Sequence, residues 1–98
     1  MKLYRGGRSL EGAVVTVDGK PLDPRHDLKL LSATGFEWTY EGAEPAQLAL
    51  ALLADHLGDD AQALSLYEKF MREIIAELDN SWELSSADID RALAELPT

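Results

Sequence analysis

The stretch that decides the fold is Phe36 to Leu57, FEWTYEGAEPAQLALALLADHL. Its first residues alternate large aromatic and polar side chains, a period that predicts a half-buried strand with Phe36, Trp38 and Tyr40 on one face. Gly42 supplies backbone freedom for a turn, and Pro45 suits the first turn of a helix, where its missing N–H would have no partner. The sequence therefore predicts a strand that leads through a turn into a helix beginning near Pro45.

The span from Ala46 to Leu57 is the most apolar part of the chain. Its polar residues are Gln47, Asp55 and His56. The run LALALLA between them has no polar face to turn toward water, so we expect this helix to lie in the middle of the domain. The alternation of Leu and Ala could also indicate a strand, but the span contains no β-branched residue, which favours a helix.

A second helix is predicted to follow almost at once. Gly58 can take the left-handed position that ends the first helix, and Asp59 with Gln62 has the pattern of a capping box at the start of the next. The second helix is predicted from Asp60 to Leu78. Its apolar stripe is Leu64, Tyr67, Met71, Ile74 and Leu78, widened by Phe70 and Ile75. The two helices therefore form an αα-hairpin with a very short connection.

The first residues of the chain carry the signals of a small antiparallel sheet. We expect Leu3–Arg5 and Ala13–Val17 to pair, with Ser9–Gly12 between them, because Val and Thr favour strands. Asp18-Gly19 is a strong hairpin-turn dipeptide. Lys20-Pro21-Leu22 can continue after it only as an edge strand, since proline has no N–H for a central ladder.

The connecting segments are less regular. Pro24 disfavours a helical conformation at the residue before it, so Asp23–Asp27 is predicted to be a loop. Leu28–Leu31 is ambiguous between a short strand and one helical turn, and Trp82–Leu84 between an extended segment and a turn.

The chain closes with a short helix. Ser85 is a good N-cap for a helix from Ser86 to Leu96, and Pro97 stops it. With no linker or repeat, residues 1–98 are predicted to form one domain. Its predicted fold class is α+β: a small antiparallel sheet packed against an αα-hairpin, with a short C-terminal helix.

The central stretch, followed by ALSLYEKFMREIIAEL and a later Trp, resembles a family of small uncharacterised proteins from bacteria, archaea and their phages, a domain of unknown function. In that family a strand with Trp and Tyr leads through glycines into Pro-Ala-Gln-Leu-Ala. The matching positions here are Trp38, Tyr40, Gly42, Pro45, Ala46, Gln47, Leu48 and Ala49. Thr39 and Glu44 stand where glycine is common in that family. If those glycines let another group approach the backbone in relatives, that approach is in doubt here. The resemblance implies a shared fold and no activity.

The net charge of −9 is unevenly distributed. Residues 1–30 hold six Lys or Arg and four acids, a balance of +2, whereas residues 31–98 hold three and fourteen, a balance of −11. Such a surface repels nucleic acid, whose binding depends on cationic side chains that neutralise phosphates. It fits a solvating surface, attraction to a basic protein partner, or adaptation to high salt.

Composition excludes several classes of protein. There is no cysteine, so thiolate catalysis, thiolate metal sites and disulfides are absent, and a reducing cytoplasm is the default location. The first residues lack the apolar region of a signal peptide, and the longest apolar run, Leu48–Ala54, is too short to span a bilayer. We expect no membrane association.

Two groups of residues could carry chemistry, and each has a simpler explanation. Around His56 lie three carboxylates, but they straddle a helix end, where Asp59 is a cap and the imidazole suits the helix dipole. His26 with Asp27 and either Ser32 or Ser9 lacks the turn that presents a nucleophilic serine. The sequence therefore predicts no catalytic residue, no metal site and no cofactor.

The sequence instead favours an interaction surface. Aromatic residues at regular spacing normally pack in the core, but aromatics rimmed by acids suit binding to a basic protein. The residues predicted to take part are Glu37, Trp38, Tyr40, Glu41, Gln47, Glu68, Glu73, Glu77, Trp82 and Glu83.

We therefore expect a non-enzymatic protein-interaction module, with an origin in a phage or mobile element as the resemblance suggests. One alternative is an inhibitor that mimics nucleic acid to block a host nucleic-acid-binding protein. Another is a small ligand-binding protein or enzyme with a pocket between sheet and helices near Tyr40, Gln47 and Trp82. A homo-oligomer that buries additional apolar helix surface also fits.

Overall fold

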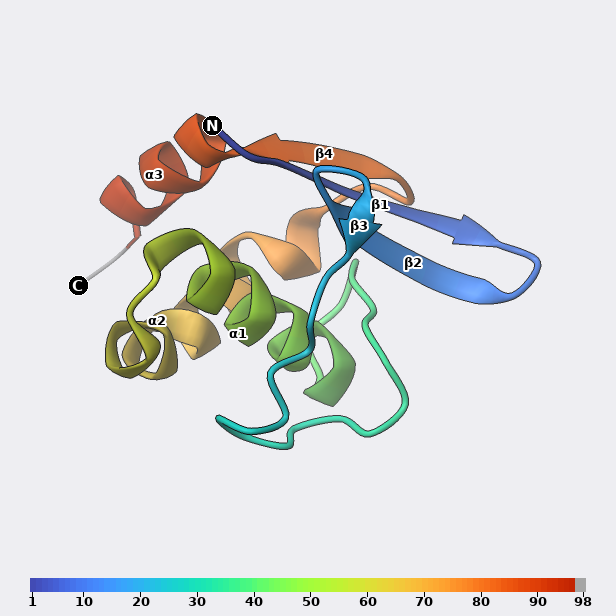
Figure 1. Cartoon of the computed structure of the whole chain (residues 1–98), viewed down its shortest axis with the longest axis horizontal. Coiled ribbons are helices and arrows are strands. Elements are labelled where there is room, and N and C mark those ends of the chain that lie inside the picture. Colours follow the sequence, from blue (N-terminus) through green and yellow to red (C-terminus); the bar gives the residue numbers. More distant parts are fainter. Residues whose placement is uncertain (97–98) are drawn as a thin grey trace.

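The computed structural model describes residues 1–96 and has the predicted α+β architecture (Figure 1). In chain order its elements are β1 (Leu3–Ser9), β2 (Gly12–Val17), β3 (Lys20–Pro21), α1 (Ala43–Leu57), α2 (Asp60–Glu73), the 3₁₀ turn η1 (Ile75–Glu77), β4 (Trp82–Ser85) and α3 (Ser86–Ala94). The strands form one antiparallel sheet in the order β3-β2-β1-β4. α1 and α2 pack together on one side of this sheet, and α3 continues directly from β4.

The predicted pairing of the first two strands is confirmed, and both strands are longer than predicted. Tyr4 lies opposite Val17, and the ladder continues until Ser9 lies opposite Gly12. The connection is therefore the two-residue turn Leu10-Glu11 rather than Ser9–Gly12. In Figure 1 this end of the hairpin projects beyond the helices.

The next turn and the edge strand follow the sequence signals. Asp18 and Gly19 have φ values of 50° and 83°, the positive values that both central residues of a type I′ turn require. The two-residue strand β3 then pairs only with β2, so Pro21 lies at the sheet edge as predicted. Residues 28–31 form neither a strand nor a helix.

The predicted strand Phe36–Tyr40 is wrong. These residues are irregular, and the fourth strand of the sheet is β4. Thr39 has a φ of 80°, outside the extended region, and its N–H donates to the carbonyl of Ile75 at 3.2 Å rather than to a neighbouring strand. Trp38 is consequently fully buried while Tyr40 is 43% exposed, so the two rings do not share a face.

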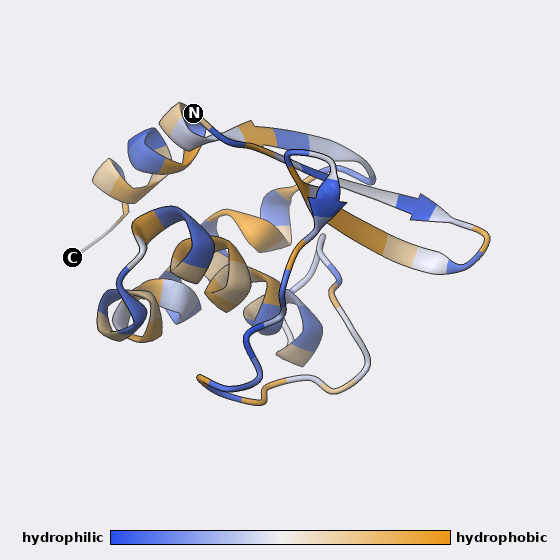
Figure 2. Cartoon of the chain, in the orientation of Figure 1, coloured by the Kyte–Doolittle hydropathy of each residue, from blue (hydrophilic) through white to orange (hydrophobic). Residues whose placement is uncertain are grey.

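α1 is the centre of the core, as its composition predicts. Every residue from Pro45 to Ala54 is buried, and Gly58 ends the helix with a φ of 64°. The four leucines of that stretch are completely buried, and burial of each contributes about 1.5–3 kcal/mol. Figure 2 shows hydrophobic residues along β2 and the middle of α1, the two layers that enclose the core.

α2 begins as predicted and ends early. Asp59 caps it by accepting a hydrogen bond from the N–H of Gln62 at 3.0 Å, but the reciprocal bond of a capping box does not form. After Glu73 the chain tightens into η1, a turn that buries Ile75 completely. The predicted continuous helix to Leu78 is therefore wrong.

The predicted apolar face of α2 is confirmed at Tyr67, Phe70 and Met71, and Leu64 is the exception. Leu64 is 37% exposed, whereas the buried residues are Ala63, Tyr67, Phe70 and Met71. Because α1 is apolar on every side, its sequence does not specify which residues of α2 pack against it. The small side chain of Ala63 permits a close approach of the two helices.

The cap of the last helix is confirmed. Ser85 accepts a bond from the N–H of Asp88 at 3.1 Å, and the Asp88 carboxylate accepts one from the N–H of Ser85 at 2.9 Å. These bonds hold the pKa of Asp88 below its usual value. Ile89 anchors the helix in the core. The predicted stop at Pro97 lies outside the described residues.

Candidate interaction surface

Three residues predicted for an interaction surface lie in the interior. Trp38 and Gln47 have no exposed surface, and Trp82 is 8% exposed. The two indole rings meet edge to face, with centroids 5.7 Å apart and an interplanar angle of 89°, a favoured geometry for aromatic pairs. Gly6 lies directly against this pair, because a Cβ there would overlap the Trp82 ring. The tryptophans therefore belong to the core.

Arg8 closes the tryptophan pair toward solvent. Its guanidinium lies 4.6 Å from the centroid of the Trp38 ring, a cation–π contact. The same guanidinium bonds the Glu37 carboxylate at 2.6 Å and the side chain of Asn80. Glu37, another predicted surface residue, is thus neutralised from within the chain.

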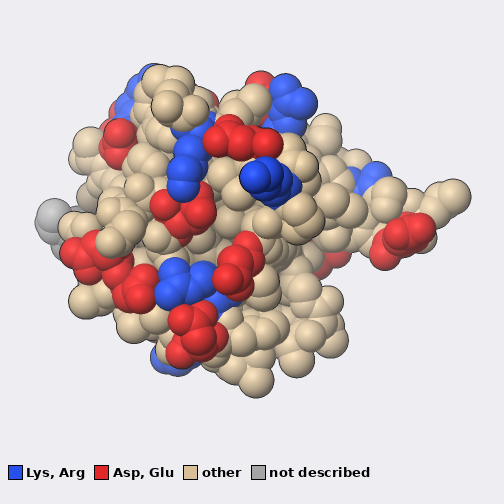
Figure 3. All heavy atoms as spheres, in the orientation of Figure 1, with Lys and Arg blue, Asp and Glu red and all other residues tan. Residues whose placement is uncertain are grey.

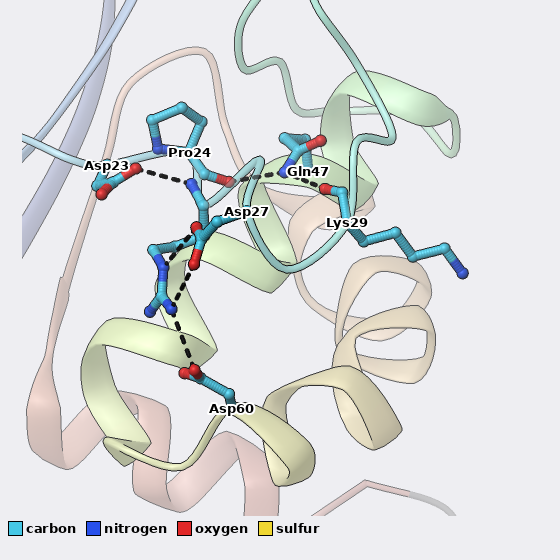
Figure 4. A network of polar contacts seen from close by, with 7 residues as sticks. Asp23, Pro24, Asp27, Lys29, Gln47 and Asp60 are labelled. Carbon is cyan, nitrogen blue, oxygen red and sulfur yellow. Dashed lines mark hydrogen bonds and ion pairs between the residues drawn. The ribbon is translucent and has the colours of Figure 1, made fainter.

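Gln47 uses its whole amide to hold the loop after β3 against α1. Its Oε1 accepts hydrogen bonds from the N–H groups of Leu31 and Ser32 at 2.7 and 2.9 Å. Its Nε2 donates to the carbonyls of Pro24 and Lys29 at 2.6 and 3.2 Å, as Figure 4 shows. A glutamine amide can make four such bonds, so none is left for a ligand. Gln47 replaces the regular backbone pairing that this loop lacks.

Tyr40 is held in a fixed position at the surface. Its hydroxyl donates to Glu44 Oε1 at 2.9 Å, and its ring lies over Gly42, where a Cβ would come within 2.8 Å of the ring. Partial burial, together with the bond to Glu44, raises the pKa of the Tyr40 hydroxyl. The ring is therefore a half-exposed, preorganised aromatic group.

The predicted acidic residues divide into two sets. Glu37, Glu68 and Glu83 form ion pairs, with Arg8 at 2.6 Å, Arg72 at 3.6 Å and Arg5 at 2.9 Å respectively. The second set is exposed and forms no ion pair within residues 1–96; its members are Glu41, Glu73 and Glu77.

The loop at Thr39 lies against η1, close in the chain to the residues of this second set. The hydrogen bond from Thr39 to Ile75 places the segment with Tyr40 and Glu41 beside η1, which ends at Glu77. Asp79, also exposed and unpaired among the described residues, follows shortly after. We define the η1 surface as Tyr40, Glu41, Glu73, Glu77 and Asp79.

On the face in Figure 3, Lys and Arg lie next to Asp and Glu rather than forming a patch of one sign. All five arginines of the chain are bound to carboxylates of the same chain; the partners are Glu83, Glu37, Asp27 with Asp60, Glu68 and Asp88.

The residues considered for metal or nucleophilic chemistry do not assemble. His56 Nε2 lies 2.6 Å from Oδ1 of Asp90, and no group of three potential ligands occurs in the described part of the chain. His26 Nε2 donates to the backbone carbonyl of Ser32 at 2.9 Å rather than contacting a hydroxyl. None of the described helices is both long and apolar enough to cross a bilayer.

The structure does not bring Tyr40, Gln47 and Trp82 together around one pocket. Trp82 lines a hollow of about 560 Å³ at the sheet edge with Arg5, Gly6, Ser81 and Glu83. A smaller crevice of about 240 Å³ lies between α1 and the segment after β3, lined by Leu22, Asp23, Arg25, Ala51 and Asp55. Neither Arg25 nor Asp55 was predicted from the sequence to line a pocket.

Asp55 is part of a partly buried network that the sequence did not reveal. Its Oδ2 accepts hydrogen bonds from the hydroxyl of Tyr4 at 2.7 Å and from Lys2 Nζ at 3.0 Å. Burial, followed by the bond to Asp55, raises the pKa of Tyr4 well above its ordinary value. No local pattern could have indicated this contact, because it joins residues 51 positions apart.

Comparison with known proteins supports the resemblance at the level of the family. The model of a family of unknown function (DUF6166) matches residues 4–95, almost the whole chain. No curated protein and no solved structure matches.

Proposed function

The chain belongs to DUF6166, a family of unknown function, and we propose that it is a non-enzymatic protein-interaction module whose η1 surface binds a basic region of a partner protein. One observation carries this proposal: the arginines are all paired within the chain, whereas the carboxylates of the η1 surface are not paired with any described residue. The unpaired charge of the η1 surface is therefore negative.

Electrostatics favours a basic protein over nucleic acid. A chain with net charge −9 repels phosphates and attracts a cationic surface, and such attraction mainly raises the association rate. Tyr40 adds an aromatic group whose position is already fixed by Glu44, so little side-chain entropy is lost when a partner covers it. Paired acids such as Glu83 contribute less, because their charge is already neutralised.

The test is co-purification of the tagged protein from its own host at low and high salt, with two double variants. Glu41→Gln with Glu77→Gln removes charge from the η1 surface. Glu11→Gln with Glu95→Gln is the matched control, because these glutamates are exposed, unpaired among the described residues and outside the η1 surface. We expect a discrete partner that is lost at high salt and with the first variant, and retained with the control.

The proposal fails if both double variants retain the partner equally, or if no partner is retained at low salt. Mimicry of nucleic acid becomes the better explanation if the partner binds nucleic acid and the two compete for it. Cytoplasmic location and an origin in a phage or mobile element stay predictions.

A further inference from the structure

The crevice between α1 and the segment after β3 combines an apolar floor with charges of both signs. Leu22 and Ala51, both buried, form the apolar part, and Asp23, Arg25 and Asp55 supply the charged groups. None of these residues belongs to the η1 surface, so the crevice is a separate feature of the molecule.

The guanidinium of Arg25 is held in one position. The Arg25 backbone has a φ of 56°, and its N–H donates to Asp23 Oδ1 at 2.9 Å. Nε and Nη2 bond the two carboxylate oxygens of Asp27 at 3.0 and 3.1 Å, and Nη2 also bonds Asp60 at 3.1 Å (Figure 4). Nη1 has no partner within residues 1–96. The loop therefore fixes a guanidinium that is ion-paired with Asp27 and Asp60 and keeps its Nη1 donors free among the described residues.

The carboxylate of Asp55 is fixed on the α1 side. Both of its hydrogen bonds, from Tyr4 and from Lys2, go to Oδ2. Oδ1 has no partner among the described residues. Because Tyr4 is completely buried, this carboxylate cannot turn away without breaking a bond to the core.

We propose that this crevice binds a small zwitterion, a free α-amino acid with a short apolar side chain. Its carboxylate would bond Arg25, its ammonium group would bond Asp55, and its side chain would lie against the exposed edge of Leu22. Charge-assisted hydrogen bonds of this kind are short and about twice as strong as neutral ones. Both protein groups are already immobilised, which lowers the entropy that binding costs.

Size and charge argue against other ligands. A crevice of about 240 Å³ has room for a free amino acid. A simple anion would meet two aspartates on a chain of net charge −9. A metal ion would need three converging ligands, and the described residues provide no such group. A zwitterion brings no net charge and matches both signs.

The test is an amide NMR titration of the whole protein with L-valine, L-valinamide and N-acetyl-L-valine. L-valinamide lacks the carboxylate and N-acetyl-L-valine lacks the ammonium group, so each removes one of the two proposed contacts. We expect saturable shifts at Asp23, Arg25, Ala51 and Asp55 with L-valine, and binding weaker by about tenfold or more with each blocked derivative.

A variant pair supplies the second arm. Asp55→Asn should weaken L-valine binding by about tenfold, whereas Asp90→Asn, which removes an exposed carboxylate paired with His56, should leave it unchanged. The comparison of the three probes uses the unaltered protein and stands even if Asp55→Asn unfolds. No saturable shift with L-valine, equal affinity for all three probes, or shifts centred outside the crevice would overturn the proposal.

Discussion

Replacing Gln47 with alanine should destabilise the domain by about 2–6 kcal/mol. The side chain makes four hydrogen bonds to the loop, and each contributes about 0.5–1.5 kcal/mol net. Ser32 is buried, so its N–H would have no solvent to replace the lost acceptor. Domains have a total stability of about 5–15 kcal/mol, so a loss of this size removes a large part of it.

The assay is urea denaturation of Gln47→Ala, with amide hydrogen exchange over residues 22–32 as a local readout. The matched control is Gln62→Ala, which removes an exposed glutamine of α2 and should change the free energy of unfolding by less than about 0.5 kcal/mol. A loss below about 1 kcal/mol for Gln47→Ala, or unchanged exchange in the loop, would refute the role given to this amide.

Three further substitutions test the packing, the backbone and the pH dependence. Gly6→Ala should lower the free energy of unfolding by about 1–3 kcal/mol, because its Cβ would overlap Trp82. Gly7→Ala should not lower it, because a Cβ there meets no atom within 4 Å. Equal losses for the two variants in urea denaturation would contradict this explanation. Thr39→Gly should raise the melting temperature. Glycine relieves the backbone strain of a φ of 80°, about 1–3 kcal/mol, which exceeds the entropic cost of its added flexibility, about 0.5–1 kcal/mol. Thr39→Ala keeps the strained φ and should not raise the melting temperature. The raised pKa of Tyr4 means that unfolded Tyr4 ionises near pH 10 while folded Tyr4 stays protonated, so stability should be unaffected below about pH 10 and fall above it. Tyr4→Phe should lack this alkaline loss in denaturation curves measured against pH.

Features that depend on adjacent residues are predicted correctly from the sequence. The turn at Asp18-Gly19, the left-handed Gly58 and the cap at Ser85 each depend on the conformational preferences of one or two adjacent residues. The central position of α1 also followed from its own residues, because a helix without a polar face has to be buried.

The alternating aromatic stretch shows where secondary-structure prediction from neighbouring residues fails. Phe36–Tyr40 has the period of a strand, but its backbone bonds to η1 rather than to the sheet. The fourth strand is Trp82–Ser85, whereas the sequence left Trp82–Leu84 open between an extended segment and a turn. Pairing between distant segments decides which of two short extended pieces enters a sheet, and propensity alone does not contain that information.

The sequence by itself thus determined the α+β class, the helical hairpin and the excess of negative charge. Only the tertiary structure decided which acids are neutralised, because Glu37 and Glu83 meet arginines that lie far from them in the chain. It also decided that Gln47 is a clamp, since its four partners are backbone groups that every sequence possesses and no residue pattern reveals.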